Sequence, residues 1–160
     1  MTAIPLRQPA NQHERRVAPR VLLIEDDAGD QLLVRRALAE DLRETDLLVI
    51  DEGDAAHDHL VRCAEERGSS GGLRPALVLL DLNLPGARGS TILALVRGDR
   101  RLRSVPVVVF TTSSREDDID ESYRLGANAY VVKPDSAAAF IRAVRAICEF
   151  WLEIAVLPRR

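Results

Sequence analysis

The chain has 160 residues, of which 46% are hydrophobic and 29% are charged, a composition that suits one soluble domain of ordinary size. Its 22 basic and 25 acidic side chains leave a net charge of −3, so no overall basic field favours nucleic acid or an anionic membrane as a partner. The two cysteines form no Cys-x-x-Cys pair and the N-terminus lacks the apolar run of a secretory signal, so we expect a cytoplasmic protein.

The first 19 residues differ from the rest of the chain. They mix Pro, Gln, Asn and Arg without any helical or alternating apolar period, which predicts a flexible N-terminal tail over residues 1–19. Residues 20–158 show regular patterning throughout, which predicts one folded domain. The length leaves no room for a separate output domain after it.

Short apolar runs alternate with amphipathic segments along the folded part. The runs predict strands at Val21–Ile24, Leu47–Ile50, Leu77–Leu80, Val107–Phe110 and Tyr130–Val132. The amphipathic segments predict helices over about Gly29–Leu42, Asp54–Glu66, Gly89–Arg97, Glu116–Leu125 and Ser136–Ala155. Because strands that are apolar on both faces belong inside a parallel sheet, the pattern indicates the α/β class.

Five strand and helix units in succession require crossover connections, which favour a doubly wound parallel sheet with helices on both faces. The flavodoxin-like strand order 2-1-3-4-5 is the arrangement we expect. In that order the first and third strands are neighbours, and a crevice opens at their carboxyl ends. Any functional site is expected in this crevice.

Acidic residues follow both of these strands. Glu25, Asp26 and Asp27 come directly after the first strand, and Asp81 follows the third. Acids at such positions can simply cap the next helix. However, several carboxylates in one small site repel one another unless a cation or a proton neutralises them. An all-oxygen set of this kind suits Mg²⁺, or Mn²⁺, as its cofactor.

Lysine is used only once in this chain. Of the 22 basic residues 21 are arginine, and the single lysine is Lys133, which directly follows the fifth strand. A lysine ammonium is a compact point charge on a flexible stem, which suits contact with one phosphoryl oxygen. Thr111 ends the fourth strand and is expected at the same level of the sheet as Asp81.

Together these blocks resemble the receiver domain of bacterial response regulators. The matching segments are Val21–Asp27, Leu79–Pro85, Val107–Thr112 and Gly126–Pro134. The resemblance implies that a sensor histidine kinase transfers a phosphoryl group from its phosphohistidine to Asp81. The chain would then be a phosphoprotein that promotes its own aspartyl phosphorylation and dephosphorylation, rather than an enzyme acting on a separate substrate.

The same resemblance assigns roles to individual residues. It implies that Asp26 and Asp81 bind the metal directly, that Asn83 binds it through the backbone carbonyl, and that Glu25 acts through water. Lys133 and Thr111 would contact the phosphoryl group, and Thr111 with Tyr130 would form the conformational switch. One departure is Arg88, which stands before Gly89 where many receivers carry Asp.

Two further segments resemble the stand-alone response regulators that partner phytochrome-type histidine kinases. They are Thr111–Ile119, and Glu149–Glu153 with its continuation to Pro158. This narrower resemblance implies a phytochrome-type kinase as the partner.

The last predicted helix has an apolar stripe that is too wide for core packing alone. Phe150 and Ile154 extend the stripe beyond the roughly 100° that a helix usually buries against a sheet. We therefore expect a homodimer that uses Phe150 and Ile154, on the surface of the last two strands and the final helix. The alternative is that the segment through Leu157 and Pro158 covers both side chains.

Three other functions fit parts of the pattern. A phosphatase of the haloacid dehalogenase type needs Asp-x-Asp, but the residue two after Asp81 is Asn83, which cannot act as a general acid. A flavin or nucleotide binder of the flavodoxin type would place phosphate against repelling acids. The last alternative is an unphosphorylated flavodoxin-like scaffold or interaction module, which the complete set of Asp, Thr and Lys argues against.

Overall fold

The computed structural model describes residues 20–41, 45–65 and 74–158. The predicted tail over residues 1–19 lies outside this part of the chain. In the described part the strands are β1 (Arg20–Ile24), β2 (Asp46–Ile50), β3 (Leu77–Leu80), β4 (Val107–Thr111) and β5 (Ala129–Val132). The helices are α1 (Ala28–Asp41), α2 (Gly53–Glu65), α3 (Gly89–Gly98), α4 (Glu116–Arg124) and α5 (Ala137–Glu149), followed by the π-helical turn η1 (Phe150–Ile154).

All five strands form one parallel sheet in the order β2-β1-β3-β4-β5. Strand β1 pairs with both of its neighbours: Val21 of β1 lies opposite Leu47 of β2 on one side and Leu77 of β3 on the other. The predicted doubly wound sheet with strand order 2-1-3-4-5 is therefore confirmed. The reversal of strand order between β1 and β3 places the expected crevice at their carboxyl ends.

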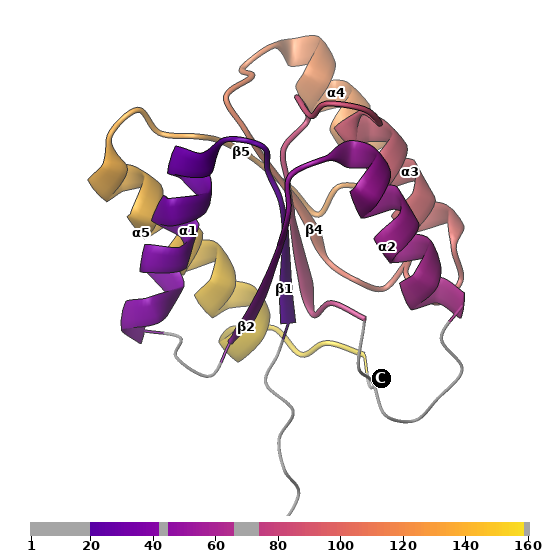
Figure 1. Ribbon diagram of the computed structural model, residues 1–160, viewed down its shortest axis with the longest axis horizontal. Helices are drawn as coiled ribbons and strands as arrows, with labels where there is room; N and C mark the ends of the chain where they lie inside the picture. The colour runs from indigo at the N-terminus through magenta and orange to yellow at the C-terminus, as the bar shows by residue number, and fades with distance from the viewer. Residues whose placement is uncertain (1–19, 42–44, 66–73, 159–160) are drawn as a thin grey trace, which may run out of the picture.

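Helices cover both faces of the sheet, and each face has its own apolar core (Figure 1). Helices α1 and α5 pack on one face through residues that include Val34, Phe140 and the buried Cys148. Helices α2 and α3 pack on the other through residues that include Leu60 and Ile92. Both cores consist of side chains removed from water, which is the main source of stability in a domain of this size.

The apolar runs do not all become fully buried strands. Every residue of β3 and β4 is buried, whereas β2 and β5 are largely half-buried. The difference follows from position, because β2 and β5 each have only one neighbouring strand. A run of apolar residues therefore identified these strands correctly but did not distinguish the edges of the sheet from its centre.

The final helix is shorter than the predicted Ser136–Ala155. The Ser136 Oγ accepts a hydrogen bond from Ala139 N at 3.2 Å and caps the start of α5. Regular α-helix ends at Glu149, and the backbone widens into η1, where Ala155 N donates to Phe150 O at 2.7 Å. Among the described residues, no helix has the length and apolar character needed to cross a membrane.

Candidate functional site

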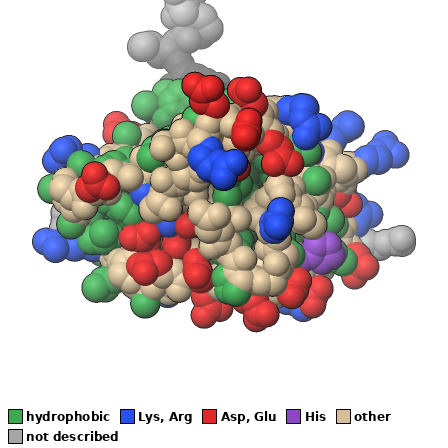
Figure 2. Space-filling model, turned by 90° about the horizontal axis from the view of Figure 1, so that it is seen from above, with side chains coloured by type: hydrophobic (Ala, Val, Ile, Leu, Met, Phe, Trp, Pro, Cys, Tyr) green, Lys and Arg blue, Asp and Glu red, His purple; other side chains and the backbone are tan. Residues whose placement is uncertain are grey.

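The carboxyl ends of four strands bring the predicted site residues together. Backbone bonds hold these ends level: Asp81 N donates to Ile24 O at 3.0 Å, and Lys133 N donates to Thr111 O at 2.7 Å. Because the strands are parallel, the side chains that follow them gather at one edge of the sheet. Figure 2 looks onto this edge, where acidic side chains lie in several groups.

Three carboxylates form a compact cluster in the crevice. Oxygen atoms of Glu25, Asp26 and Asp81 all lie within 4.8 Å of one another. Glu25 is 1% exposed and Asp81 is 5% exposed, whereas Asp26 is open to solvent. Such a set of oxygen donors, with one side open, fits a small divalent cation that keeps some of its water. The backbone N of Asn83 donates to Asp81 Oδ1 at 3.1 Å, which places the predicted fourth ligand residue beside the cluster.

The Lys133 ammonium lies inside this acidic group. Its Nζ is 2.5 Å from Glu25 Oε2, 2.6 Å from Asp81 Oδ2 and 2.8 Å from Asp30 Oδ2. An ammonium group has three N–H donors, so each of its hydrogens has a carboxylate acceptor. Lys133 thus lies beside Asp81, and Asp30 is a partner that the sequence did not indicate.

Burial and neighbouring charges have opposite effects on the pKa values of Glu25 and Lys133. Burial raises the pKa of Glu25 above its ordinary value, although Lys133 counteracts this by favouring the ionised carboxylate. Burial alone would lower the pKa of Lys133, but its bonds to Asp30, Asp81 and Glu25 outweigh that effect and raise it. Lys133 is therefore a permanent positive charge at physiological pH.

The two predicted switch residues occupy neighbouring positions. Thr111 is fully buried, and its Oγ1 donates to Asp81 Oδ1 at 2.7 Å. The ring of Tyr130 is half-buried, and its hydroxyl donates to Ser113 O at 3.0 Å. Ser113 also donates through Oγ to Asp118 Oδ2 at 2.5 Å. A short chain of contacts thus connects Asp81 to the loop before α4 and to β5.

Asp27 has a structural role in place of a ligand role. Its Oδ1 accepts a hydrogen bond from Asp30 N at 2.8 Å, which is the contact of a helix N-cap. The capping explanation for acids after a strand is therefore right for Asp27. It does not apply to Glu25 or Asp81, whose carboxylates face Lys133.

The loop that carries Asn83 rests on the start of α2. Gly53 N donates to Pro85 O at 2.9 Å, and a Cβ added at Gly53 would lie 1.9 Å from Ala87 O. Gly86 has a φ of +78°, which a side chain would strain. These glycines allow the two loops to touch. A cavity of about 300 Å³ lies beside them, between this loop and α4, and Arg88 is part of its lining.

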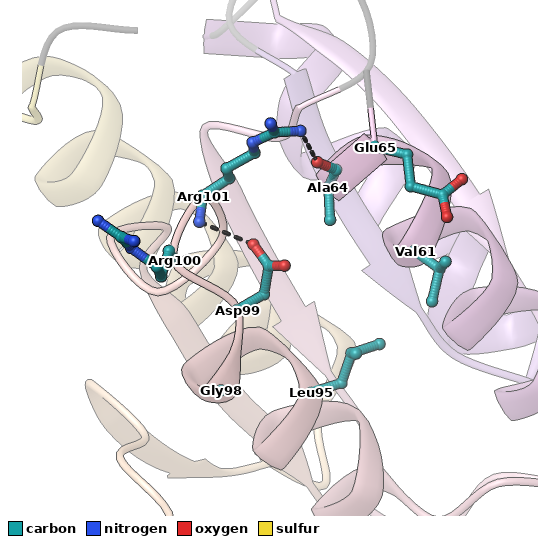
Figure 3. A pocket seen from close by; sticks show the side chains of 8 residues that line it. All are labelled: Val61, Ala64, Glu65, Leu95, Gly98, Asp99, Arg100 and Arg101. Atoms are coloured by element: carbon teal, nitrogen blue, oxygen red, sulfur yellow. Dashed lines mark hydrogen bonds between the residues drawn. The ribbon is translucent and has the colours of Figure 1, made fainter. Parts of the chain in front are cut away.

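A larger cavity of about 610 Å³ lies away from the acidic cluster, between α2 and the end of α3 (Figure 3). Val61 and Leu95 form its apolar wall, and the Arg101 guanidinium is bonded to Ala64 O. Asp99 accepts from the backbone N of Arg101 at 2.7 Å. Its charged lining residues include both acids and arginines, and none of Asp81, Thr111 and Lys133 lines it.

The predicted dimer residues lie outside the crevice. Phe150 is 47% exposed and Ile154 is 63% exposed. Leu157 and Pro158 line a small pocket with residues that precede β3 and β4 and leave both side chains open. The alternative in which Leu157 and Pro158 cover Phe150 and Ile154 is therefore wrong.

The fold and the site together define a receiver domain, and comparison with known families agrees. Residues 21–145 match the model of the response regulator receiver domain, and the chain belongs to this family. The matched region contains the whole acidic cluster, Thr111 and Lys133.

Particular relatives narrow the similarity. The chain is 38% identical over 138 residues to response regulator Rcp1 of Synechocystis sp., covering 86% of this chain and 92% of Rcp1. The crystal structure of the phosphorylated cyanobacterial phytochrome response regulator RcpA superposes with a TM-score of 0.80 at 37% identity, over 88% of this chain and 99% of RcpA. The Mn²⁺-bound form of Rcp1 superposes with a TM-score of 0.77 at 37% identity, with the same shares of the two chains covered.

Proposed function

We propose that residues 20–158 act as a phosphoacceptor in a two-component phosphorelay, with Asp81 as the acceptor. One observation carries the proposal: Asp81 is buried, and its two carboxylate oxygens accept from Thr111 Oγ1 at 2.7 Å and from Lys133 Nζ at 2.6 Å. A phosphoryl group on Asp81 would meet the same two donors. These two contacts support Asp81 as the acceptor and Thr111 and Lys133 as the groups that stabilise its product.

The reaction is a transfer between two side chains. A carboxylate oxygen of Asp81 attacks the phosphorus of a phosphohistidine, the new P–O bond forms, and the P–N bond breaks with the electron pair leaving on the imidazole nitrogen. The Lys133 ammonium and the Thr111 hydroxyl stabilise charge on the phosphoryl oxygens, which is where such reactions gain most. Water attack on the same phosphorus later returns Asp81 and releases phosphate.

We assign a divalent cation, Mg²⁺ or Mn²⁺, to Glu25, Asp26, Asp81 and the backbone carbonyl of Asn83. The support is the all-oxygen cluster within 4.8 Å and the similarity to Rcp1, which has a Mn²⁺-bound form. When bound, the cation neutralises charge on the transferred group.

We infer that the phosphodonor is a sensor histidine kinase of the phytochrome type, acting in the cytoplasm. The similarity to RcpA, a phytochrome response regulator, supports this choice. Transfer of labelled phosphate from a phytochrome-type kinase, and none from an unrelated sensor kinase, is the expected result.

The expected homodimer surface included the fourth strand, but every residue of β4 is buried. We therefore propose that β5 and the final helix, together with α4, which contacts β5, form the output surface through which the chain pairs as a homodimer. Most of the large apolar side chains that are exposed in the described residues lie on these elements or directly after them: Tyr123, Val132, Phe150, Ile154 and Val156. Tyr130 on β5 reaches the loop after Thr111, so the switch pair joins Asp81 to this surface.

Mass spectrometry of the intact chain tests the function against the scaffold alternative. Incubation with Mg²⁺ and acetyl phosphate should add one phosphoryl group, and omission of Mg²⁺ should prevent the addition. An unchanged mass in the complete mixture would favour an unphosphorylated scaffold.

A further inference from the structure

Among the described residues, Asp30 is the one partner of the Lys133 ammonium that does not belong to the cluster of Glu25, Asp26 and Asp81. Lys133 Nζ is bound to Glu25, Asp81 and Asp30, and the clustered oxygen donors are those of Glu25, Asp26 and Asp81. Two of the three lysine partners are thus shared with the cation site. Asp30 contacts Lys133 from outside that cluster.

The first turn of α1 holds Asp30 in a fixed position. Its backbone N donates to Asp27 Oδ1 at 2.8 Å, and the next residue, Gln31, donates through Nε2 to Glu25 O at 2.7 Å. These bonds fasten the helix start to the end of β1. The Asp30 side chain is 24% exposed and that of Lys133 is 4% exposed, so water screens their contact only in part.

A cation in the cluster changes the balance around Lys133. Glu25 and Asp81 would then share their negative charge between the cation and the ammonium, and their hold on Lys133 would weaken. A buried ammonium that loses its partners is costly, and it would leave the acceptor.

We propose that Asp30 is a positioning residue that keeps Lys133 beside Asp81 when a divalent cation occupies Glu25 and Asp81. This inference rests on the proposed function, because it assumes that Lys133 and the cation act together on Asp81. It has a thermodynamic consequence: Asp30 makes cation binding easier, and it does so through Lys133.

A double-mutant cycle tests the coupling. Calorimetry measures Mg²⁺ binding, without a phosphodonor, to the parent, Asp30→Ala, Lys133→Ala and the double variant. Asp30→Ala removes a partly buried charged contact, so we expect it to weaken Mg²⁺ binding about fivefold relative to the parent. In the Lys133→Ala background the same change should weaken Mg²⁺ binding less than about twofold. The remaining effect there is the loss of a nearby negative charge.

Two controls make the outcome specific. Asp117→Ala removes an acid from the first turn of α4 whose side chain is 90% exposed, and it should leave Mg²⁺ binding unchanged. Asp30→Asn replaces Asp30→Ala if circular dichroism shows that the alanine variant is unfolded. An equal weakening in both Lys133 backgrounds, or none in either, would overturn the proposal.

A kinetic readout separates this inference from the function on which it rests. Asp30→Ala should take up phosphate from acetyl phosphate more slowly than the parent at saturating Mg²⁺. If the parent takes up none, the proposed function fails, and the Mg²⁺ titration still decides whether Asp30 acts through Lys133.

Discussion

Lys133 Nζ lies 2.6 Å from Asp81 Oδ2, although the two residues are 52 positions apart in the chain. The contact exists because β3 and β5 flank β4 and end at the same edge of the sheet. It places a permanent positive charge on the carboxylate that we propose as the acceptor.

Replacement of Lys133 by arginine should abolish rapid phosphorylation while preserving the charge. The ammonium is 4% exposed and is surrounded by three carboxylates, so the larger planar guanidinium cannot occupy the same space. Phosphoryl uptake from acetyl phosphate, followed by intact mass, should be at least about tenfold slower. Arg124→Lys changes an exposed basic residue of α4 and should have no effect. A Lys133→Arg variant as fast as the parent would show that charge alone suffices.

Removal of the Thr111 hydroxyl should slow phosphorylation even when the replacing side chain has the same shape as threonine. Thr111→Val deletes the donor that meets Asp81 Oδ1, and the loss of a hydrogen bond to a charged group corresponds to about a tenfold slower uptake. Thr111→Ser keeps the hydroxyl and should remain within about twofold of the parent. Equal rates for the valine and serine variants would exclude a role for the hydroxyl.

The close contact between Gly53 and the loop that carries Asn83 should make a side chain at position 53 destabilising. A methyl group at Gly53 would lie 1.9 Å from Ala87 O, so Gly53→Ala must displace backbone. We expect a loss of about 1–3 kcal/mol in the free energy of unfolding, measured with urea. Gly98→Ala is the matched change, because no described residue lies within 4 Å of a Cβ there, and it should stabilise α3 by about 0.5–1 kcal/mol. A Gly53→Ala variant as stable as the parent would mean that the loop can move away from the added methyl group without cost.

Phe150 and Ile154 should determine the oligomeric state. Both side chains are about half exposed or more, and burial of such apolar surface favours association. Light scattering should give a dimer for the parent, and Phe150→Asp combined with Ile154→Arg should give a folded monomer. A parent mass near 17.7 kDa at micromolar concentration would rule out the dimer.

Much of the fold could be predicted because it depends on local patterns. Each apolar run became a strand, and their alternation with helices left one favoured topology. The half-burial of β2 and β5 follows from the predicted strand order, which leaves these two strands at the edges of the sheet, although their apolar runs alone do not indicate it. The π-helical turn after Glu149 was missed, since the apolar period continues through Phe150 and Ile154.

The proximity of the candidate site residues could be predicted where each of them directly follows a strand. Glu25, Asp81 and Lys133 are of this kind, and sheet topology alone brings them together. Asp30 was missed because its contact with Lys133 depends on how the first turn of α1 lies against the end of β5. The only sign of this contact in the sequence was an acid in the first turn of a helix. Such acids are common because they interact favourably with the helix dipole, so Asp30 did not stand out.

The most direct test of the central claim compares two aspartate to asparagine changes after incubation with Mg²⁺ and acetyl phosphate. Asp81→Asn removes the proposed acceptor, whereas Asp27→Asn changes a nearby acid that caps α1, and asparagine can replace it as a cap. The account predicts that the mass of the parent and of Asp27→Asn rises by one phosphoryl group, and that the mass of Asp81→Asn does not change. A phosphoryl group retained by Asp81→Asn would contradict the assignment of Asp81 as the acceptor.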